Sequence, residues 1–423
     1  MPIVLINPPQ PYLVRPGIML QLGLMYVASA LKKTNDVSFE DLSCYKIFDA
    51  CRYLKEEYSQ GILCFTGTSL DIPTVNKMAD VLCEQFHIVV GGAGATLSPE
   101  FYNYNVHTIV QNEAESIISN VIEEILGGSK ERYFKADKFI DDLDTISFPA
   151  RELLKKQGGN IFLDSQYDGE STLIAASRGC PYNCAFCASS GIWNRSLRER
   201  SAGNVIQEII EIKRYGVNRF RFVDDSITTK RGWLQELCEE INKLDWPIYW
   251  RASIRVLPND VELFQMMRDS GCIEVSFGVE SGDQDVLNLL DKKIKVNDSR
   301  DALVNAYSTG LKTRVLMMMG LPGTTPETTD KDIEFLDSVP YTSLALKTFV
   351  PLPGSDIWKY PDKYGVSIID KDLEKYNFFI NTSEGESLFP PLIKLDTISG
   401  EELMKNKRKL LDYAAASTKL NRG

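Results

Sequence analysis

The stretch SRGCPYNCAFC, residues 177–187, contains the only clustered cysteines of the chain. Cys180, Cys184 and Cys187 are separated by three and then two residues, so a single loop can wrap their thiolates around one iron–sulfur cluster. Three thiolates leave one iron of a four-iron cluster free for an external ligand, just as catalytic metal sites keep an open position. A structural zinc site would need a fourth ligand, and no nearby His or Cys supplies one. Incidental core cysteines are the other alternative, but a polar turn with glycine and proline is not typical of a core.

The cysteines directly follow a predicted strand, Thr172–Ser177, and so lie on a loop at its carboxyl end, the edge at which parallel α/β sheets bind ligands. Five more strands are predicted, at Arg219–Val223, Ile248–Ser253, Ile273–Val279, Leu311–Met319 and Ser343–Val350. Helices are predicted between them, at Val205–Tyr215, Trp233–Leu244, Val261–Ser270, Ser299–Ser308 and Glu327–Leu336. Six units are too few for a closed eight-stranded barrel, so we expect a partial (β/α)6 barrel over residues 171–355.

An earlier series of the same kind occupies residues 1–130. Its predicted strands are Ile3–Asn7, Ile62–Thr66, Ile88–Val90 and Thr108–Val110, and its predicted helices are Leu22–Leu31, Thr74–Phe86 and Glu113–Leu126. This alternation predicts a Rossmann-like α/β domain with a parallel sheet. Residues 131–170 are charged and polar and are predicted to form a linker, and residues 356–423 a short helical C-terminal region.

The composition excludes several classes of function. A net charge of -11 over 423 residues argues against a nucleic-acid or anionic-membrane partner. No apolar run reaches the length of a membrane span and no signal peptide precedes the first strand, so the sequence predicts a cytoplasmic protein. His87 and His107 are the only histidines, which argues against chemistry based on imidazole.

The cysteine pattern, with Phe186 in the aromatic position before the third cysteine, resembles the hallmark of the radical S-adenosylmethionine superfamily. The resemblance extends over most of residues 1–355. It implies that the three cysteines hold a 4Fe-4S cluster, whose free iron is chelated by the methionine end of S-adenosylmethionine. The reduced cluster then cleaves S-adenosylmethionine into methionine and a 5'-deoxyadenosyl radical.

The ends of the later strands carry residues that suit this cosubstrate. Within the resemblance, the acids after the second strand face the methionine ammonium, and the polar residues of the third strand meet the methionine carboxylate. The acid that ends the fourth strand accepts from the ribose hydroxyls, and the Gly/Pro turns after the fifth and sixth strands contact the adenosine. The residues implied to bind S-adenosylmethionine are Phe186, Asp224, Asp225, Arg251, Ser253, Arg255, Glu280, Met319, Gly320 and Val350.

The N-terminal motifs, among them Asn7-Pro8-Pro9 and Gly91-Gly92, follow in the order seen in cobalamin-binding domains of this superfamily. The resemblance implies that small residues at the strand ends leave room for the nucleotide tail of cobalamin. The implied cobalamin-binding residues are Thr66, Thr68, Ser69, Gly91, Gly92 and Thr96. The motif Asp-x-His-x-x-Gly is absent, so no histidine is expected below the cobalt. A degenerate domain retained as a scaffold is the alternative.

Taken together, the resemblance implies a cobalamin-dependent radical methyltransferase that acts on an unactivated carbon. The alternatives are a cobalamin-dependent radical cyclase or rearrangement enzyme, a methylthiotransferase, and a non-catalytic sensor of the cluster or of cobalamin. The implied partners are a small-molecule or peptide substrate and an external electron donor such as flavodoxin or ferredoxin. Neither nucleic acid nor a membrane is expected.

Overall fold

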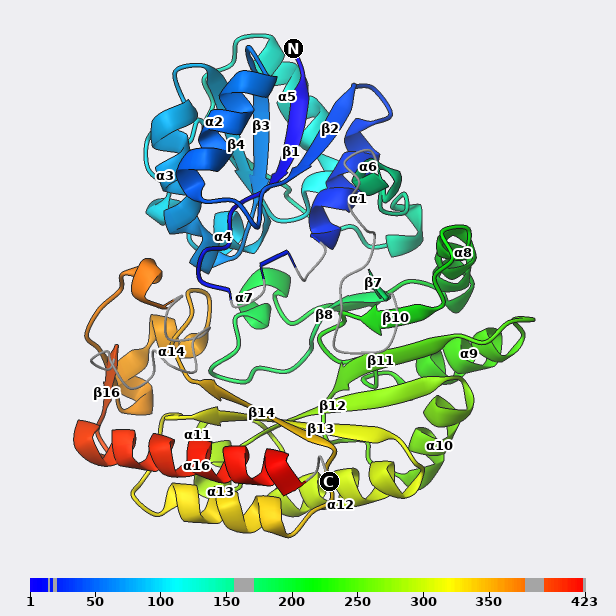
Figure 1. Ribbon diagram of the computed structural model, residues 1–423, viewed down its shortest axis with the longest axis vertical. Coiled ribbons are helices and arrows are strands. Elements are labelled where there is room, and N and C mark those ends of the chain that lie inside the picture. Colours follow the sequence, from blue (N-terminus) through cyan, green and yellow to red (C-terminus); the bar gives the residue numbers. More distant parts are fainter. Residues whose placement is uncertain (14–15, 18–20, 156–170, 377–391, 421–423) are drawn as a thin grey trace. The chain divides into compact units, whose positions relative to one another are not determined.

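The computed structural model describes residues 1–13, 16–17, 21–155, 171–376 and 392–420. These residues divide into two compact units (Figure 1). The first unit contains the described residues up to Thr172 together with Asp372–Tyr376. The second contains Leu173–Lys371 together with the described residues from Leu392 onward. Residues 156–170 of the predicted linker lie outside the described part of the chain.

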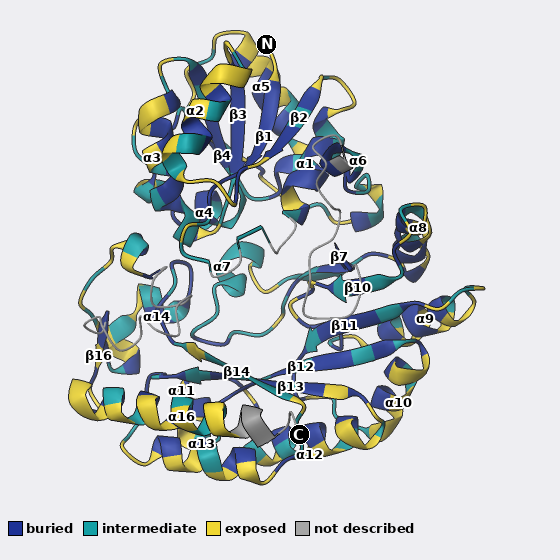
Figure 2. Cartoon of the chain, in the orientation of Figure 1, coloured by how far each residue is buried: buried dark blue, intermediate teal, exposed yellow. Residues whose placement is uncertain are grey.

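The first unit is built on a six-stranded parallel sheet in the order β2-β1-β3-β4-β5-β6. Its strands are β1 (Ile3–Asn7), β2 (Val37–Asp41), β3 (Gly61–Thr66), β4 (Phe86–Gly91), β5 (Thr108–Gln111) and β6 (Tyr133–Lys135). Its helices are α1 (Leu22–Leu31), α2 (Ile47–Glu57), α3 (Ile72–Leu82), α4 (Gly92–Leu97), α5 (Ile118–Leu126) and α6 (Glu152–Lys155). Strand β1 is buried over its whole length (Figure 2), as expected for a central parallel strand covered on both faces.

Several elements of this unit differ from the sequence prediction. Strand β2 and helix α2 were not predicted, because the β2 sequence VSFED is polar and α2 buries only three side chains. The predicted helix Thr74–Phe86 ends at Leu82, and Phe86 instead begins β4. Strand β6 extends the sheet within the segment predicted to be a linker, and two of its three residues are exposed.

A short segment from late in the chain belongs to the first unit. Leu373 is 3% exposed and packs in the hydrophobic core with residues of β1, β3 and α3. Glu374 accepts a hydrogen bond from the Tyr12 hydroxyl at 2.6 Å and forms an ion pair with Lys77 Nζ at 2.7 Å. Local sequence does not predict this placement, because the contacts join residues that lie roughly 300 positions apart.

The second unit is built on a six-stranded sheet in the order β7-β10-β11-β12-β13-β14, and the pairs from β10 to β14 are parallel. Its strands are β7 (Thr172–Ile174), β10 (Arg219–Phe222), β11 (Tyr249–Ile254), β12 (Cys272–Glu280), β13 (Lys312–Met319) and β14 (Ser343–Thr348). The helices between them are α8 (Ala202–Lys213), α9 (Arg231–Asn242), α10 (Val261–Asp269), α11 (Gln284–Leu289), α12 (Val296–Ser308) and α13 (Thr328–Asp337). The open sheet confirms the predicted partial barrel.

The two faces of this sheet differ in character. On β12, Val275, Phe277 and Val279 are fully buried on the face that helices cover, while Ser276 and Gly278 are half-buried on the other face. Neighbouring strands place Arg251 and Arg314 on that second face, in register with Glu274 and Ser276. This polar face therefore leads to the carboxyl ends of the strands, where the predicted site lies.

The C-terminal region is helical in part. It contains α14 (Asp356–Lys359) and α16 (Gly400–Leu420), but also an unpredicted antiparallel pair, β15 (Val366–Ile368) with β16 (Ile393–Leu395). Helix α16 packs on α13, and Asn406 donates to the carbonyl of Thr325 at 3.1 Å. Within the described residues, no helix is both long and apolar enough to cross a membrane.

Candidate functional site

The cysteine loop begins at a hairpin that requires glycine. Strand β8 (Ser177–Gly179) pairs antiparallel with β9 (Leu197–Glu199). Gly179 has a φ of 96°, and a Cβ at this position would lie 2.0 Å from the carbonyl oxygen of Ser196. No other residue fits this close approach, so Gly179 determines the direction in which the chain enters the loop.

Backbone hydrogen bonds hold the loop in place. The amide of Ala185 donates to the carbonyl of Leu290 at 2.9 Å, and the carbonyl of Ala185 accepts from the amide of Ile357 at 3.1 Å. The amide of Cys187 donates to the carbonyl of Cys184 at 3.0 Å, which closes a turn between two of the thiols. The loop is thereby attached both to the segment after α11 and to the start of α14.

The three thiols lie close enough to affect one another. Burial, with smaller contributions from Asp225, Cys184 and Cys180, raises the pKa of Cys187 to about 11, although a hydrogen bond from the Ser189 backbone opposes the shift. Burial also raises the pKa of Cys180, with Asp225 and Cys184 acting in the same direction and Arg255 opposing them. Iron must therefore displace protons from these thiols, as it does when it binds cysteine elsewhere.

This donor set fits a cubane cluster. In a cubane each thiolate binds a different iron, and three cysteines on one loop are the donors that such a cluster with one open iron needs.

Arg255 lies against the cysteine loop. Its Nη1 donates to Cys184 Sγ at 3.5 Å, and its guanidinium lies 3.7 Å from the centroid of the Tyr182 ring. Its Nη2 donates to the carbonyl oxygen of Lys292. The resemblance implies that Arg255 meets the methionine carboxylate. In the structure this guanidinium contacts Cys184, one of the three cysteines predicted to bind the cluster.

The two acids after β10 have different surroundings. Asp224 is buried and accepts hydrogen bonds from the amide of Ala176 and the hydroxyl of Ser177. Burial raises the pKa of Asp224 to about 6, although these hydrogen bonds oppose the shift. Asp225 is exposed and accepts from the Ser189 hydroxyl at 2.6 Å, and it acts electrostatically on Cys180 and Cys187. Of the two predicted ligands of the methionine ammonium, Asp225 is the one beside the cysteines.

Glu280 ends β12 in a conformation that is rare for residues other than glycine, with a φ of 71°. Its Oε1 accepts from Lys292 Nζ at 2.7 Å, and both side chains are almost fully buried. The register between β12 and β13 shifts between Gly278 and Glu280, which marks a bulge at this strand end. Bulges and strained residues of this kind are typical of functional strand ends.

Arg251 and Ser253 both lie on β11, on the polar face of the sheet. Arg251 is in register with Glu274, and burial together with nearby Arg314 lowers the pKa of Arg251 while Glu274 opposes this. Ser253 stands opposite Ser276 in the middle of the polar face. Arg255, the third predicted contact to the methionine carboxylate, lies beside the cysteines.

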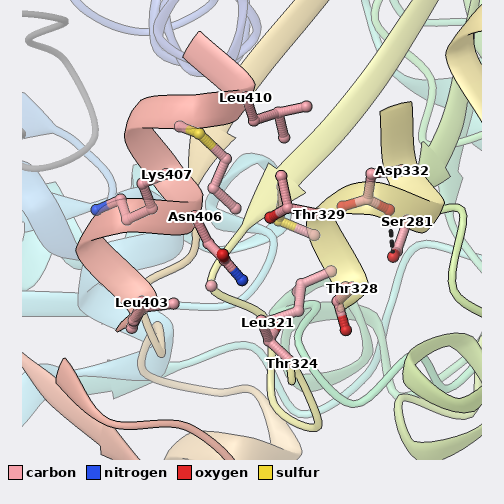
Figure 3. Close-up of a pocket in the computed structure, with 13 residues that line it drawn as sticks. Ser281, Leu321, Thr324, Thr328, Thr329, Asp332, Leu403, Asn406, Lys407 and Leu410 are labelled. Carbon is pink, nitrogen blue, oxygen red and sulfur yellow. Dashed lines mark hydrogen bonds between the residues drawn. The ribbon is translucent and has the colours of Figure 1, made fainter. Parts of the chain in front are cut away.

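The turns after β12 and β13 are held together by α13 (Figure 3). Asp332 accepts hydrogen bonds from the Ser281 hydroxyl at 2.7 Å and from the Gly282 amide at 2.6 Å. Burial raises the pKa of Asp332 to about 6, with both hydrogen bonds opposing the shift. Met319 is buried and Gly320 has a φ of 74°, and both line a small pocket that α16 covers.

The strand ends of the first unit carry the residues predicted to bind cobalamin. Thr66 ends β3 in register with Gly91, and Gly92 has a φ of 85°. A Cβ on Gly92 would lie 2.7 Å from Thr66 Oγ1, so this glycine is needed where the two loops meet. By contrast, the nearest atom to a Cβ on Gly91 would be 3.9 Å away.

Most hydroxyls at this edge are already used by the protein itself. Thr68 caps the 3-10 helix Ser69–Asp71 and donates to Asp71 Oδ2 at 2.9 Å, and Ser69 is hydrogen-bonded to Ser98 at 2.8 Å. Thr96 Oγ1 donates to the carbonyl of Gly92 and accepts from the amide of Asn112. Within the described residues, only Thr66 among these hydroxyls has no hydrogen-bond partner.

This edge fits a cobalamin tail at two positions. The half-buried Thr66 hydroxyl and the open side of Gly91 stand at the carboxyl ends of adjacent parallel strands, where such sheets bind nucleotides. The other predicted residues shape the loops.

His87 and His107 stack on each other with centroids 4.8 Å apart, and His87 Nε2 is hydrogen-bonded to Thr108. Burial lowers the pKa of His87 to about 4.

Sequence reasoning missed Lys292 and Asp332. Lys292 lies in the sequence DKKIK, which is typical of an exposed charged turn, and Asp332 lies in a helix with many other acids. Both are buried: Lys292 binds Glu280 at the end of β12, and Asp332 binds the turn that follows β12. The sequence signal for Lys292 was its position shortly after the motif Gly278-Val279-Glu280-Ser281-Gly282.

Comparisons with known proteins relate the second unit to a superfamily. The model of the radical SAM superfamily matches residues 174–336. An uncharacterized methyltransferase of Pyrococcus horikoshii is 26% identical over 414 residues, which cover 92% of this chain and 86% of the relative. An anaerobic magnesium-protoporphyrin IX monomethyl ester cyclase of Rubrivivax gelatinosus is 28% identical over 231 residues, 54% of this chain and 39% of the relative.

A solved structure shares the fold of both units. The radical S-adenosylmethionine methyltransferase TsrM of Kitasatospora setae, with cobalamin and a [4Fe-4S] cluster bound, superposes with a TM-score of 0.69 at 15% identity. The match covers 88% of this chain and 77% of TsrM. At this level of identity the likeness establishes the fold.

Proposed function

Because the chain belongs to the radical S-adenosylmethionine superfamily, we propose that it is a cobalamin-dependent radical methyltransferase acting on an unactivated carbon. The observation that carries the first half of this proposal is the loop on which Cys180, Cys184 and Cys187 lie beside Asp225 and Arg255. The second half is supported by the Rossmann-like unit and by the relatives named as methyltransferases.

In this proposal the residues of the second unit bind and orient S-adenosylmethionine. Asp225 attracts the methionine ammonium, because a carboxylate and a cation form a charge-assisted hydrogen bond. Glu280 accepts from the ribose hydroxyls, and the turn at Met319-Gly320 offers its backbone to the adenine. Arg255 donates a hydrogen bond to Cys184 Sγ and so orients this sulfur for metal binding.

When bound, the cluster supplies one electron to S-adenosylmethionine and cobalamin supplies the methyl group. An external electron donor, such as a flavodoxin or a ferredoxin, is needed to supply that electron. The chain contributes the alignment of the bound groups and the exclusion of water from them. Thr66 and Gly91 are the positions at which the first unit would hold the cobalamin tail.

The test is an anaerobic incubation of reconstituted, reduced protein with S-adenosylmethionine, with and without hydroxocobalamin. A cobalamin-dependent methyltransferase is expected to form 5'-deoxyadenosine together with S-adenosylhomocysteine, and only the latter depends on cobalamin. The homocysteine product arises because S-adenosylmethionine restores the methyl group that cobalamin transfers. Absence of both products would contradict the proposal.

A second candidate is a cobalamin-dependent radical cyclase that does not methylate, which the similarity to the Rubrivivax cyclase favours. The same incubation separates the two functions. A cyclase is expected to form 5'-deoxyadenosine without S-adenosylhomocysteine, whether or not cobalamin is added. This result would retain the radical chemistry and overturn the methyl transfer.

A further inference from the structure

Two adjacent lysines after α11 have opposite surroundings. The side chain of Lys293 is 71% exposed and pairs with Asp291, whereas that of Lys292 is 6% exposed and pairs with Glu280 at 2.7 Å. Burying an ammonium is costly unless a partner compensates its charge, so the fold keeps Lys292 inside only because Glu280 faces it. A buried ion pair of this kind is weak evidence for stability, which suggests another role.

The backbone around this ion pair is shaped to bring the two charges together. Asp291, Lys293 and Glu280 all have positive φ values, of 52°, 56° and 71°. A Cβ on Gly278 would lie 2.7 Å from Glu280 Oε1 and 3.1 Å from Lys292 Nζ, so the ion pair packs directly against this glycine. Strained residues that converge on one contact are typical of functional sites.

The segment that carries Lys292 also holds the cysteine loop. The carbonyl of Leu290 accepts from the Ala185 amide at 2.9 Å, and the carbonyl of Lys292 accepts from Arg255, which itself contacts Cys184. Lys292 Nζ lies 5.5 Å from the centroid of the Phe186 ring. Residues 290–292 therefore connect the strand end that carries Glu280 to the loop that carries the cysteines.

The far side of Glu280 is fixed as well. Asp332 accepts from Ser281 and Gly282, the two residues that follow Glu280, and so anchors the turn to α13 (Figure 3). With the turn anchored and Oε1 bound by Lys292, the carboxylate has one orientation. Its other oxygen, Oε2, accepts no hydrogen bond from the described residues.

We propose that Lys292 is a positioning residue for S-adenosylmethionine: it binds Glu280 Oε1 so that Oε2 accepts from a ribose hydroxyl. The inference rests on the part of the proposed function that places the ribose at Glu280, and it does not depend on cobalamin or on methyl transfer. Residues 290–292 also hold the cysteine loop. Lys292 therefore keeps the ribose-binding carboxylate at a fixed position relative to the cysteines that bind the cluster.

The test compares the affinity for S-adenosylmethionine with that for its 2'-deoxyadenosyl analogue in anaerobically reconstituted protein. A hydrogen bond to a charged group corresponds to about a 10- to 100-fold difference in affinity, so the wild type is expected to prefer the ribose ligand by that factor. Lys292→Gln is expected to lose most of this preference while it retains its iron. Lys293→Gln, the exposed neighbour, is expected to keep the preference.

The outcomes of this binding comparison distinguish a positioning role of Lys292 from a role in stability alone. An unchanged ribose preference in Lys292→Gln, or an equal loss of affinity for both ligands, overturns the proposal. If Lys292→Gln loses its iron, Lys292→Arg decides, because it keeps the charge. Retention of the ribose preference in Lys292→Arg supports the proposal, and its loss at full iron content contradicts it. A wild type that binds S-adenosylmethionine without ribose preference also overturns the inference, whatever the fate of the methyl-transfer proposal.

Discussion

The two units offer the carboxyl edges of two parallel sheets, and these edges differ in what their side chains do. In the second unit the edge carries charged residues and thiols that bind one another, as Lys292 binds Glu280 and Arg255 contacts Cys184. In the first unit the edge carries hydroxyls and glycines, and the protein itself uses most of the hydroxyls.

This difference shows how strongly the side chains themselves support each proposed cofactor: the cluster and S-adenosylmethionine in the second unit, and cobalamin in the first. Clustered thiols are the preferred ligands of iron–sulfur clusters. A buried ion pair carries a desolvation penalty, so its presence at a strand end indicates a specific role. Hydroxyls and glycines at a strand end suit many nucleotides, so there the fold and the relatives carry more of the argument. The predictions below test whether the two edges act as separately as this comparison implies.

The largest effect is expected from Cys184→Ala. Without this thiolate the cluster loses a ligand, so formation of 5'-deoxyadenosine from S-adenosylmethionine should fall to background. Product analysis after anaerobic reduction measures this effect. Cys44→Ala, which removes an exposed thiol of the first unit, is the matched control and should keep full product formation. An equal loss of 5'-deoxyadenosine formation in both variants would contradict the assignment of the cluster to the second unit.

A large effect of pH is expected from Asp332. Its folded pKa of about 6 lies above the unfolded value of 3.8, so between these values the folded state binds more protons. Its contribution to stability therefore falls as pH rises from about 4 to 6, by at most about 3 kcal/mol. Asp332→Asn should thus gain stability relative to the wild type over this range. Denaturant midpoints at pH 4, 5, 6 and 7 measure it, and a pH-independent difference would contradict it.

Asp225 and Asp224 separate ligand binding from structure within one edge. Asp225→Asn should weaken S-adenosylmethionine binding by about 10- to 100-fold at unchanged iron content, because it removes a charge that faces the ligand's cation. Asp224→Asn should leave affinity largely unchanged and instead alter stability, because Asp224 binds Ala176 and Ser177. Titration calorimetry under anaerobic conditions distinguishes the two, and the reverse pattern would contradict the assignment.

The smallest effect is expected from Thr66→Val in the first unit. Loss of one neutral hydrogen bond should weaken cobalamin binding by about 5-fold, without any change in iron content or in stability. Thr96→Val should instead destabilise the first unit, because its hydroxyl bonds both Gly92 and Asn112. Equilibrium binding of hydroxocobalamin measures the first effect. Unaltered cobalamin affinity in Thr66→Val would show that the Thr66 hydroxyl does not bind cobalamin.

Apolar patterns were enough to predict the central elements. Strand β1 and helix α1 lie where the sequence places them, because buried parallel strands and core helices consist of uninterrupted or periodic apolar residues. Strand β2 was missed because its sequence VSFED has no such pattern, and its pairing with β1 alone makes it a strand. Local sequence does not contain that information.

The site was predicted at its cysteines and less fully around them. Spacing alone predicts Cys180, Cys184 and Cys187 as ligands, because metal ligands on one loop are local in sequence. Which of two consecutive acids faces the cysteines depends on strand register, and the structure selects Asp225 over Asp224. Lys292 was missed because its burial depends on contacts with distant Glu280 and Arg255.

The most direct test of the central claim, that the two edges bind two separate cofactors, is metal analysis of the wild type and Cys184→Ala after anaerobic reconstitution with iron, sulfide and hydroxocobalamin. The account predicts about four irons and one cobalt per wild-type chain, and one cobalt without cluster iron in the variant. Wild-type protein that retains iron but no cobalt, or a variant that loses cobalt together with its iron, would contradict it.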